Sequence, residues 1–504
     1  MHGLGAAVFL SSAAVMVLEI SAARLLAPYV GMSVYTWTCI IATILAGMSA
    51  GHWVGGRLSE VERAVARRRL AALFAAGALG VVAVPFLLRL FAPMLVVEGV
   101  PFLFGISALS VVLFFAPSSL IACVSPMLTK MAIDMEPEAR GRALGRMYAL
   151  GALGSILGTL AAGFVFISWI GTNGTILSVA AVLGLLAAGF ARAARHRTAT
   201  LAVVAAAALS AGLLVTGRGG LAGICQVESR YYCIRVVDYD DADSEAARMM
   251  VLDHMAHGIN ERRDPGRLHS PYVELTDTVV RGRFGGGAAL RSYFIGGGAY
   301  TLPRAWATAY PDGRHVVAEI DPAVTRAARD HMWFAAHPSV HVVHADARRH
   351  LQSLAPAPQF DVVVGDAFHD ISVPSHLVTV EFARQVAARL TPRGLYVLNI
   401  VDRRHEPAFL LSQVRTLAEA FTAVEVWSDE DQARAAKRLT YLVIASNDPV
   451  PMNQLQSDRF PDRRWFRRTL NELAGRLGPD DVPLMTDDLA PVDRLLSDVA
   501  SFGN

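Results

Sequence analysis

The uneven distribution of apolar residues most constrains how this chain can fold. Apolar residues dominate up to about Thr216, and ordinary soluble composition follows a boundary near Gly217–Gly220. The mean hydropathy of +0.38 is high for a soluble protein, and a bilayer span needs about 20 apolar residues. Since 504 residues are too many for one compact core, we expect an α-helical transmembrane bundle followed by a soluble region.

Seven apolar stretches are long enough to be candidate spans. The first is too long, and too closely followed by the second, to be a cleaved signal peptide. The seventh is rich in alanine and could instead lie on the surface or pack inside the protein. The predicted spans are at about 3–26, 35–57, 70–92, 102–128, 145–169, 172–191 and 199–216.

Charge in the loops predicts the orientation of the bundle. Lys and Arg lie in the loops after the second, fourth and sixth spans, whereas Ala27–Val34 and Ser168–Asn173 contain neither. Basic loops stay in the cytoplasm, so the amino terminus is expected there. Seven spans would put the soluble region outside. Six would leave it inside, where a nucleoside cofactor is expected.

Two further features bear on the membrane region. Cys225 and Cys233 are the only cysteines outside the predicted spans, and a disulfide between them would favour the outside, while free thiols would leave the side open. Glu19, Arg24 and His52 lie inside predicted spans. Charges there are costly, so they indicate either a structural Glu–Arg contact near the interface or a role in transport or substrate binding.

The soluble half centres on the stretch Arg291–Asp321. An apolar run ends in Gly296, Gly297 and Gly298, a helical segment follows, and a second apolar run carries Glu319 and Asp321. Glycines let a backbone approach a nucleoside closely, and an acidic residue about 20 residues further on accepts hydrogen bonds from ribose. This pattern predicts a nucleoside site.

Two more acidic residues follow predicted strands. Asp346 follows Val340–His344, and Asp366 follows Phe360–Val364. Strands alternating with helices predict a doubly wound, Rossmann-like parallel sheet whose ligands bind at the carboxyl ends of the strands. There we expect Glu319 to hold the ribose, Asp346 with the Ala347 backbone to contact the adenine, and Asp366 to face the reacting atom. The simpler alternative for a single such aspartate is a helix cap.

These observations predict four regions. They are a multi-pass helical region at 1–216, a small β subdomain at 221–275, a Rossmann-like catalytic domain at 276–450 and a helical tail at 451–504. In that tail, the Arg-rich segment Asp462–Arg468 is expected to form the solvated face of a helix, or else to contact the membrane surface.

Residues 225–445 resemble the spermidine synthase (polyamine aminopropyltransferase) family. The whole arrangement is similar to that family's membrane-fused branch, whose methyltransferase-like sheet follows a small β domain. Residues 18–37 (LEISAARLLAPYVGMSVYTW) and 296–304 (GGGAYTLPR) also resemble this branch. The matching motifs are ESRYYCIRV (228–236), LDH (252–254), SPYVE (270–274), GGG (296–298), EID (319–321), AD (345–346) and DVVVGDAFHDISVP (361–374).

The resemblance implies transfer of an aminopropyl group from decarboxylated S-adenosylmethionine to putrescine, with release of methylthioadenosine. This adenosyl compound is a co-substrate, and no prosthetic group is implied. Asp366 matches the catalytic aspartate, and a one-residue insertion would align Asp370 and Pro374 with a second family aspartate and a proline. The implied nucleoside contacts are Gly296, Gly297, Gly298, Glu319, Asp321, Asp346, Ala347, Pro374 and Tyr232, and the implied substrate contacts are Asp370, Tyr272 and Glu274.

The chain departs from the family at three positions. Tyr232 replaces a glutamine, Val273 replaces a histidine, and Ala299 replaces an aspartate. The nucleoside half of the site is therefore better preserved than the amine half. A second hypothesis is consequently a methyltransferase that uses S-adenosylmethionine. A third is a membrane transporter or sensor of polyamines whose soluble region only binds a nucleoside.

Charge and histidine spacing limit the remaining classes. The net charge of +2 gives no reason to expect nucleic acid as a partner. The histidines lack the spacing of metal ligands, so no metal site is expected. We expect amine and adenosyl sulfonium substrates, a multi-pass position in the plasma membrane with the lipid bilayer as a partner, and, as the family implies, a homo-oligomer.

Overall fold

The computed structural model describes residues 2–97, 100–193, 224–240, 246–367, 373–429 and 438–496. The chain divides into a helical unit, residues 1–230, and an enzyme unit, residues 231–502, each treated separately below. The boundary predicted near Gly217–Gly220 and the seventh predicted span, 199–216, lie outside the described residues.

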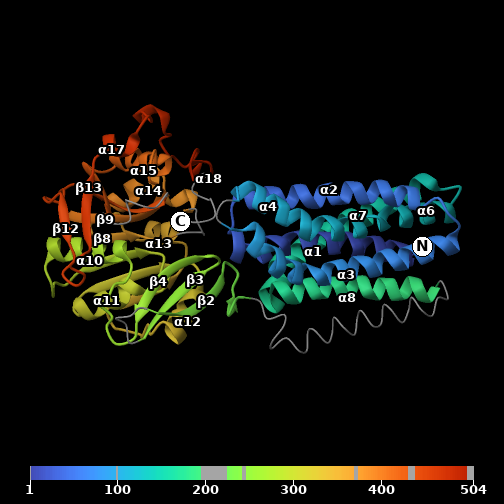
Figure 1. Cartoon of the computed structure of the whole chain (residues 1–504), viewed down its shortest axis with the longest axis horizontal. Coiled ribbons are helices and arrows are strands. Elements are labelled where there is room, and N and C mark those ends of the chain that lie inside the picture. Colours follow the sequence, from blue (N-terminus) through green and yellow to red (C-terminus); the bar gives the residue numbers. More distant parts are fainter. Residues whose placement is uncertain are drawn as a thin grey trace. The chain divides into compact units, whose positions relative to one another are not determined.

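The helical unit is a bundle of long apolar helices (Figure 1). Among the described residues, five helices are long and apolar enough to cross a membrane: Gly3–Val30, Val34–Leu58, Arg63–Leu95, Phe102–Met135 and Arg140–Ala193. Their segments are α1 (His2–Val30), α2 (Val34–Leu58), α3 (Arg63–Leu95), α4 (Phe102–Ser110), η1 (Val111–Phe115), α5 (Ala116–Ala122), α6 (Val124–Met135), α7 (Arg140–Ala161), η2 (Ala162–Phe166) and α8 (Ile167–Ala193).

The last of these helices accommodates two predicted spans. It has 54 residues, and at 1.5 Å per residue a straight helix of that length would extend roughly 80 Å, against about 30 Å of hydrocarbon. Gly171 interrupts it with a φ of +70°, a conformation that glycine adopts without a steric penalty. The predicted spans 145–169 and 172–191 therefore lie on the two sides of Gly171.

Glycines bring the helices of the bundle into backbone contact. On α2, Gly47, Gly51 and Gly55 face backbone atoms of Phe115, Ser119 and Cys123, and a methyl group on any of them would overlap those atoms. On α7, Gly154 and Gly158 meet the backbone of α1 in the same way. Close approach of this kind holds helices together where lipid supplies no hydrophobic drive.

We predict that Gly154→Leu destabilises the helical unit. The added side chain would meet the carbonyl of Phe9, and overpacking costs about 1–3 kcal/mol. The matched control is Gly145→Leu on the same helix, because nothing lies within 4 Å of the position that its Cβ would take. Thermal unfolding in detergent should show a lower midpoint for the first variant only. Equal midpoints would contradict the packing role.

The enzyme unit begins with a small antiparallel sheet. Its strands are β2 (Cys233–Tyr239), β3 (Ala247–Leu252) and β4 (Met255–Glu261), paired in that order. The short strand β1 (Val227–Glu228) ends the preceding unit.

The second sheet has nine strands in the order β12-β13-β10-β11-β9-β8-β5-β6-β7. Strands β7, β6, β5, β8 and β9 pair in parallel, whereas β11 pairs antiparallel with both β9 and β10. The predicted methyltransferase-type, Rossmann-like fold is confirmed, with the correction that the sheet is mixed. The strands are β5 (Arg291–Ile295), β6 (Arg314–Glu319), β7 (Val340–His344), β8 (Phe360–Gly365), β9 (Leu390–Arg403), β10 (Ala423–Asp429), β11 (Arg438–Ser446), β12 (Gln454–Gln456) and β13 (Arg464–Arg468).

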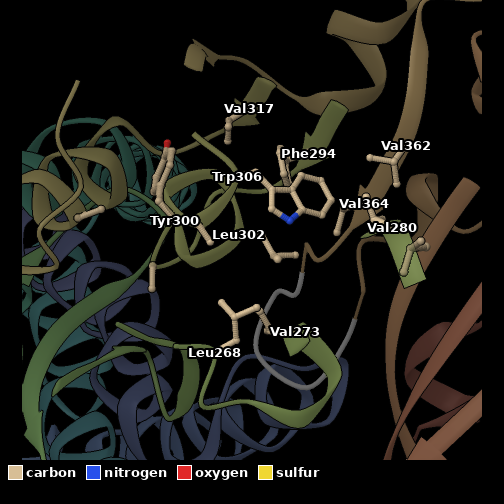
Figure 2. Packing of buried hydrophobic residues seen from close by; sticks show 14 of the residues in the cluster. Leu268, Val273, Val280, Phe294, Tyr300, Leu302, Trp306, Val317, Val362 and Val364 are labelled. Carbon is tan, nitrogen blue, oxygen red and sulfur yellow. The ribbon is translucent and has the colours of Figure 1, made fainter. Parts of the chain in front are cut away.

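Helices connect these strands and close two cores. Alternation along β5 sends Phe294 into one core and Tyr293 and Ile295 into the other. In the first core, Trp306 packs near Phe294 (Figure 2), and its indole N–H donates to the Asp277 carboxylate at 2.8 Å. The helices are α10 (Pro271–Phe284), α11 (Thr301–Ala309), α12 (Pro322–His331), α13 (Ala347–Ser353), η3 (Ser375–Leu377), α14 (Val380–Ala387), α15 (Ala408–Ala418), α17 (Leu470–Ala474), η4 (Pro479–Asp481) and α18 (Val492–Leu495).

The prediction of a helical tail at 451–504 was wrong in part. Strands β12 and β13 extend the large sheet beyond residue 450, and the Arg-rich segment 462–468, predicted as a helix face, contains β13. Trp465 of this strand is buried, and Arg467 pairs with Glu425 of β10 at 2.8 Å. Pairing with β10 therefore decided the conformation of this segment, against the helix predicted from its sequence.

Candidate functional site

The glycine turn lies where β5 ends. Gly296 and Gly298 have φ values of +92° and +49°, which glycine adopts most readily. A methyl group on Gly296 would come within 2.9 Å of the Asp366 carbonyl oxygen. The turn therefore requires glycine for both conformation and space, and it lies directly beside the end of β8.

Glu319 holds this turn together from the end of β6. Its carboxylate accepts hydrogen bonds from the backbone N–H of Gly297 and of Asp321, each at 2.8 Å. Burial raises the pKa of Glu319, and the backbone hydrogen bonds oppose that rise. The carboxylate is thus brought to the glycine turn as predicted. Its contact with ribose stays a prediction.

Asp321 and Asp346, two further predicted site residues, act as helix caps. Asp321 accepts from the backbone N–H of Ala323 at 2.9 Å, and Asp346 accepts from that of Arg349 at 2.9 Å. The other oxygen of Asp346 lies 2.8 Å from Nε2 of His376, a partner that the sequence did not reveal. Capping accounts for the local role of both residues, and their contacts with a nucleoside stay predictions.

Ala347 and Tyr232 lie close to these acidic residues. Ala347 begins α13, and its carbonyl accepts from the hydroxyl of Tyr293 at 3.0 Å. Tyr232 is buried, and burial followed by the charge of Glu319 raises its phenolic pKa. It therefore stays protonated near Glu319.

Asp366 follows β8 and is held by two side chains. The hydroxyl of Tyr272 donates to Oδ2 at 3.1 Å, and the amide of Asn399 donates to Oδ1 at 3.0 Å. Burial raises the pKa of Asp366, while both hydrogen bonds lower it. The pKa of Tyr272 is raised by burial and by the charge of Asp366, so its hydroxyl stays a donor. The carboxylate is fixed in orientation and is a stronger base than an exposed aspartate.

Asn399 is a site residue that sequence reasoning missed. The only signal was a single amide within the apolar strand LYVLNIV (395–401). Its side-chain oxygen is buried and has no hydrogen-bond partner among the described residues. A cavity of about 20 Å³ lined by Asn399, Ala367 and Leu377 lies beside it, which is enough for about one water. An unsatisfied acceptor here favours a ligand that donates hydrogen bonds.

His257 is a second residue that the motifs did not single out. It lies on β4, and its carbonyl accepts from the N–H of Ala299 at 3.5 Å. Burial lowers the imidazole pKa to about 4, so the side chain is neutral at physiological pH. The small sheet thereby contributes one wall to the glycine turn.

Glu274, predicted as a substrate contact, is engaged elsewhere. One carboxylate oxygen accepts from the hydroxyl of Ser457 and the other from the guanidinium of Arg463. Two residues along a helix turn the side chain by about 200°, so Tyr272 and Glu274 of α10 point to different sides. In this structure the residue anchors the C-terminal strands, and its contact with substrate stays a prediction.

Two further predicted contacts lie on the chain after Asp366. Asp370 falls in residues 368–372, outside the described part of the chain. Pro374 directly precedes η3, and its carbonyl accepts from the backbone N–H of Leu377 at 2.9 Å. Across the residues that the structure describes, no group of three His, Cys, Asp or Glu is placed to hold a metal.

Comparisons with known proteins give partial matches. No family model matches the chain. A polyamine aminopropyltransferase of Vibrio vulnificus is 31% identical over 142 residues, which are 28% of this chain and 46% of that protein. The chain thus matches about half the length of this curated relative.

Solved structures match a larger share of the chain than this relative does. A probable spermidine synthase from Corynebacterium glutamicum matches 45% of this chain and 80% of its own, at 24% identity and a TM-score of 0.39. The spermidine synthase from Thermotoga maritima matches 44% and 71%, at 18% identity and a TM-score of 0.32. Over 142 residues, the chain is therefore similar in sequence to a polyamine aminopropyltransferase, as its motifs predicted.

Proposed function

We propose that the enzyme unit is an aminopropyltransferase that moves the aminopropyl group of decarboxylated S-adenosylmethionine to an amine such as putrescine. The observation that carries this proposal is Asp366, oriented by Tyr272 and Asn399 beside the glycine turn. The unsatisfied oxygen of Asn399 adds a second acceptor next to this carboxylate. Two adjacent acceptors suit the N–H groups of an amine.

This geometry supports a direct displacement at the aminopropyl carbon. The amine nitrogen attacks the aminopropyl carbon bonded to the sulfonium, and that C–S bond breaks with its electron pair going to sulfur. The products are the new secondary amine and methylthioadenosine. Asp366 accepts the proton that the nitrogen loses, and the raised pKa of the buried carboxylate suits that task. Tyr272 and Asn399 keep its lone pairs directed at the nitrogen.

Removing the carboxylate should abolish turnover and leave nucleoside binding intact. We predict that Asp366→Asn lowers the rate by about 10²–10⁴-fold, the range for loss of a general base. Release of methylthioadenosine from decarboxylated S-adenosylmethionine, in the presence of a panel of amines, measures the rate. Calorimetric binding of methylthioadenosine is the control. Wild-type turnover in this variant would exclude Asp366 as the base.

The hydroxyl of Tyr272 should set the acid limb of the pH profile. Its hydrogen bond lowers the pKa of Asp366, so Tyr272→Phe should raise that pKa. The base must be deprotonated to act, and the acid limb of kcat/KM should therefore move to higher pH. Tyr310→Phe, which removes another buried hydroxyl, should leave the limb unmoved. An unshifted limb in Tyr272→Phe would mean that Asp366 is not the titrating base.

A methyltransferase that uses S-adenosylmethionine is the second candidate function. Glu274, a residue implied to contact substrate, is occupied by Ser457 and Arg463, and the family histidine is replaced by the buried Val273. Both observations weaken the case that the site binds an amine. Turnover with S-adenosylmethionine but none with its decarboxylated form would decide for this alternative.

We further propose that the helical unit spans the plasma membrane and that the enzyme unit follows it on the non-cytoplasmic side. Thr172 lies in Ser168–Asn173, which has no Lys or Arg, and its backbone N–H donates to Glu228 at 2.9 Å. Arg24, near the end of α1 that leads into Ala27–Val34, which also has none, donates to the carbonyl of Ser229 at 2.7 Å. The chain therefore leaves the helical unit at the end opposite its basic loops.

Two cysteines also favour the non-cytoplasmic side. Cys225 and Cys233 are both disulfide-bonded, and such bonds persist in oxidising compartments. The substrates must then be available on the non-cytoplasmic side. Homo-oligomerisation stays a prediction.

Reporter fusions should establish the side directly. We predict that alkaline phosphatase fused after Asn504 is active, because it folds only outside the cytoplasm, and that a green fluorescent protein fused there stays dark. The same reporters placed after Leu58 should give the opposite result. Fluorescence from the fusion after Asn504 would put the enzyme unit in the cytoplasm.

A further inference from the structure

The helical unit contains a cavity that the proposed reaction does not use. Its volume is about 550 Å³, within the range of small-molecule sites. Segments α1, α2, α5, α6 and α7 form its walls. Gly154 keeps α7 in backbone contact with α1, and Gly51 keeps α2 in backbone contact with α5. These contacts fix the walls beside the cavity.

The cavity lies at the basic end of the unit. His52 lines it from the last turns of α2, Lys130 from the second half of α6, and Tyr148 from the early turns of α7. In Figure 1 the amino terminus and α6 lie at this same end. By the charge of its loops, this end faces the cytoplasm.

The lining favours an anionic ligand over a cationic one. It combines apolar side chains with the hydroxyls of five Ser and Thr residues, and it includes Lys130 and His52 but no Asp or Glu. Lys130 pairs with Asp134 at 2.5 Å, and both side chains are about half exposed. Exposed ion pairs are weak, so Lys130 can exchange this partner for an incoming anion. A polycation such as a polyamine would find no counter-charge.

The rim indicates that the ligand enters from the bilayer. Leu144 and Tyr148 line the cavity and are 40% and 72% exposed. Further along α7, Leu153, Ile156 and Leu157 are also exposed, so the helix carries the apolar surface expected to face lipid.

We propose that this cavity binds one anionic phospholipid from the leaflet at the basic end of the unit. Lys130, His52 and the hydroxyls receive the phosphate headgroup, and an acyl chain lies along the apolar wall. Basic pockets between spans on the cytoplasmic side are suited to such headgroups.

Thermal unfolding of the full chain in detergent tests the proposal. Dioctanoyl-phosphatidylglycerol should raise the midpoint of the wild type. Dioctanoyl-phosphatidylcholine, inorganic phosphate and spermine should each have little effect. Lys130→Gln should weaken the response about fivefold in apparent Kd, the share of one cation near a membrane surface. Ala152→Phe should abolish the response by filling the cavity.

The matched control is Arg142→Gln. This cation is exposed at the same end of the unit but does not line the cavity, so the response should persist. Equal weakening in Arg142→Gln would mean general surface attraction and would overturn the site. No response to phosphatidylglycerol, or an equal response to phosphatidylcholine, phosphate alone or spermine, would also overturn it. None of these outcomes depends on enzymatic activity.

Discussion

The parallel pairing of β5 between β6 and β8 is the constraint on which the candidate active site depends. Parallel strands end at one edge, so this pairing brings the glycine turn, Glu319 and Asp366 together although they are far apart in sequence. Glu319 then ties the turn to β6 through two backbone N–H groups. Burying a carboxylate is unfavourable unless it is hydrogen-bonded. The two N–H donors offset that penalty, and their positions fix the conformation of the turn.

The reacting side of the site depends on a second assembly. Tyr272 comes from α10 and Asn399 from β9, and both donate to Asp366, which follows β8. The carboxylate therefore has fixed lone pairs and a raised pKa. In the same helix, Glu274 faces Ser457 and Arg463, so α10 joins the candidate base on one side to the C-terminal strands on the other.

The helical unit is held together differently. Lipid offers no hydrophobic drive between helices, and glycines on α2 and α7 bring backbones into contact instead. This close packing does not extend everywhere, because a cavity remains between α1, α2, α5, α6 and α7. Its lining has Lys130, His52 and hydroxyls without carboxylates, which argues against a polyamine pathway through that cavity.

The sequence by itself determined the apolar half, the glycine turn with its acidic partner, and the alternation of strands and helices from β5 to β9, because each depends on local composition and spacing. It also placed Asp366 at a strand end. Only the tertiary structure decided that Asn399 and Tyr272 hold Asp366, that Glu274 turns to the tail, and that residues 464–468 form a strand rather than a helix. These outcomes depend on partners distant in sequence. Pairing with a strand or a buried charge stabilises a side chain or a segment more than its own local preference does.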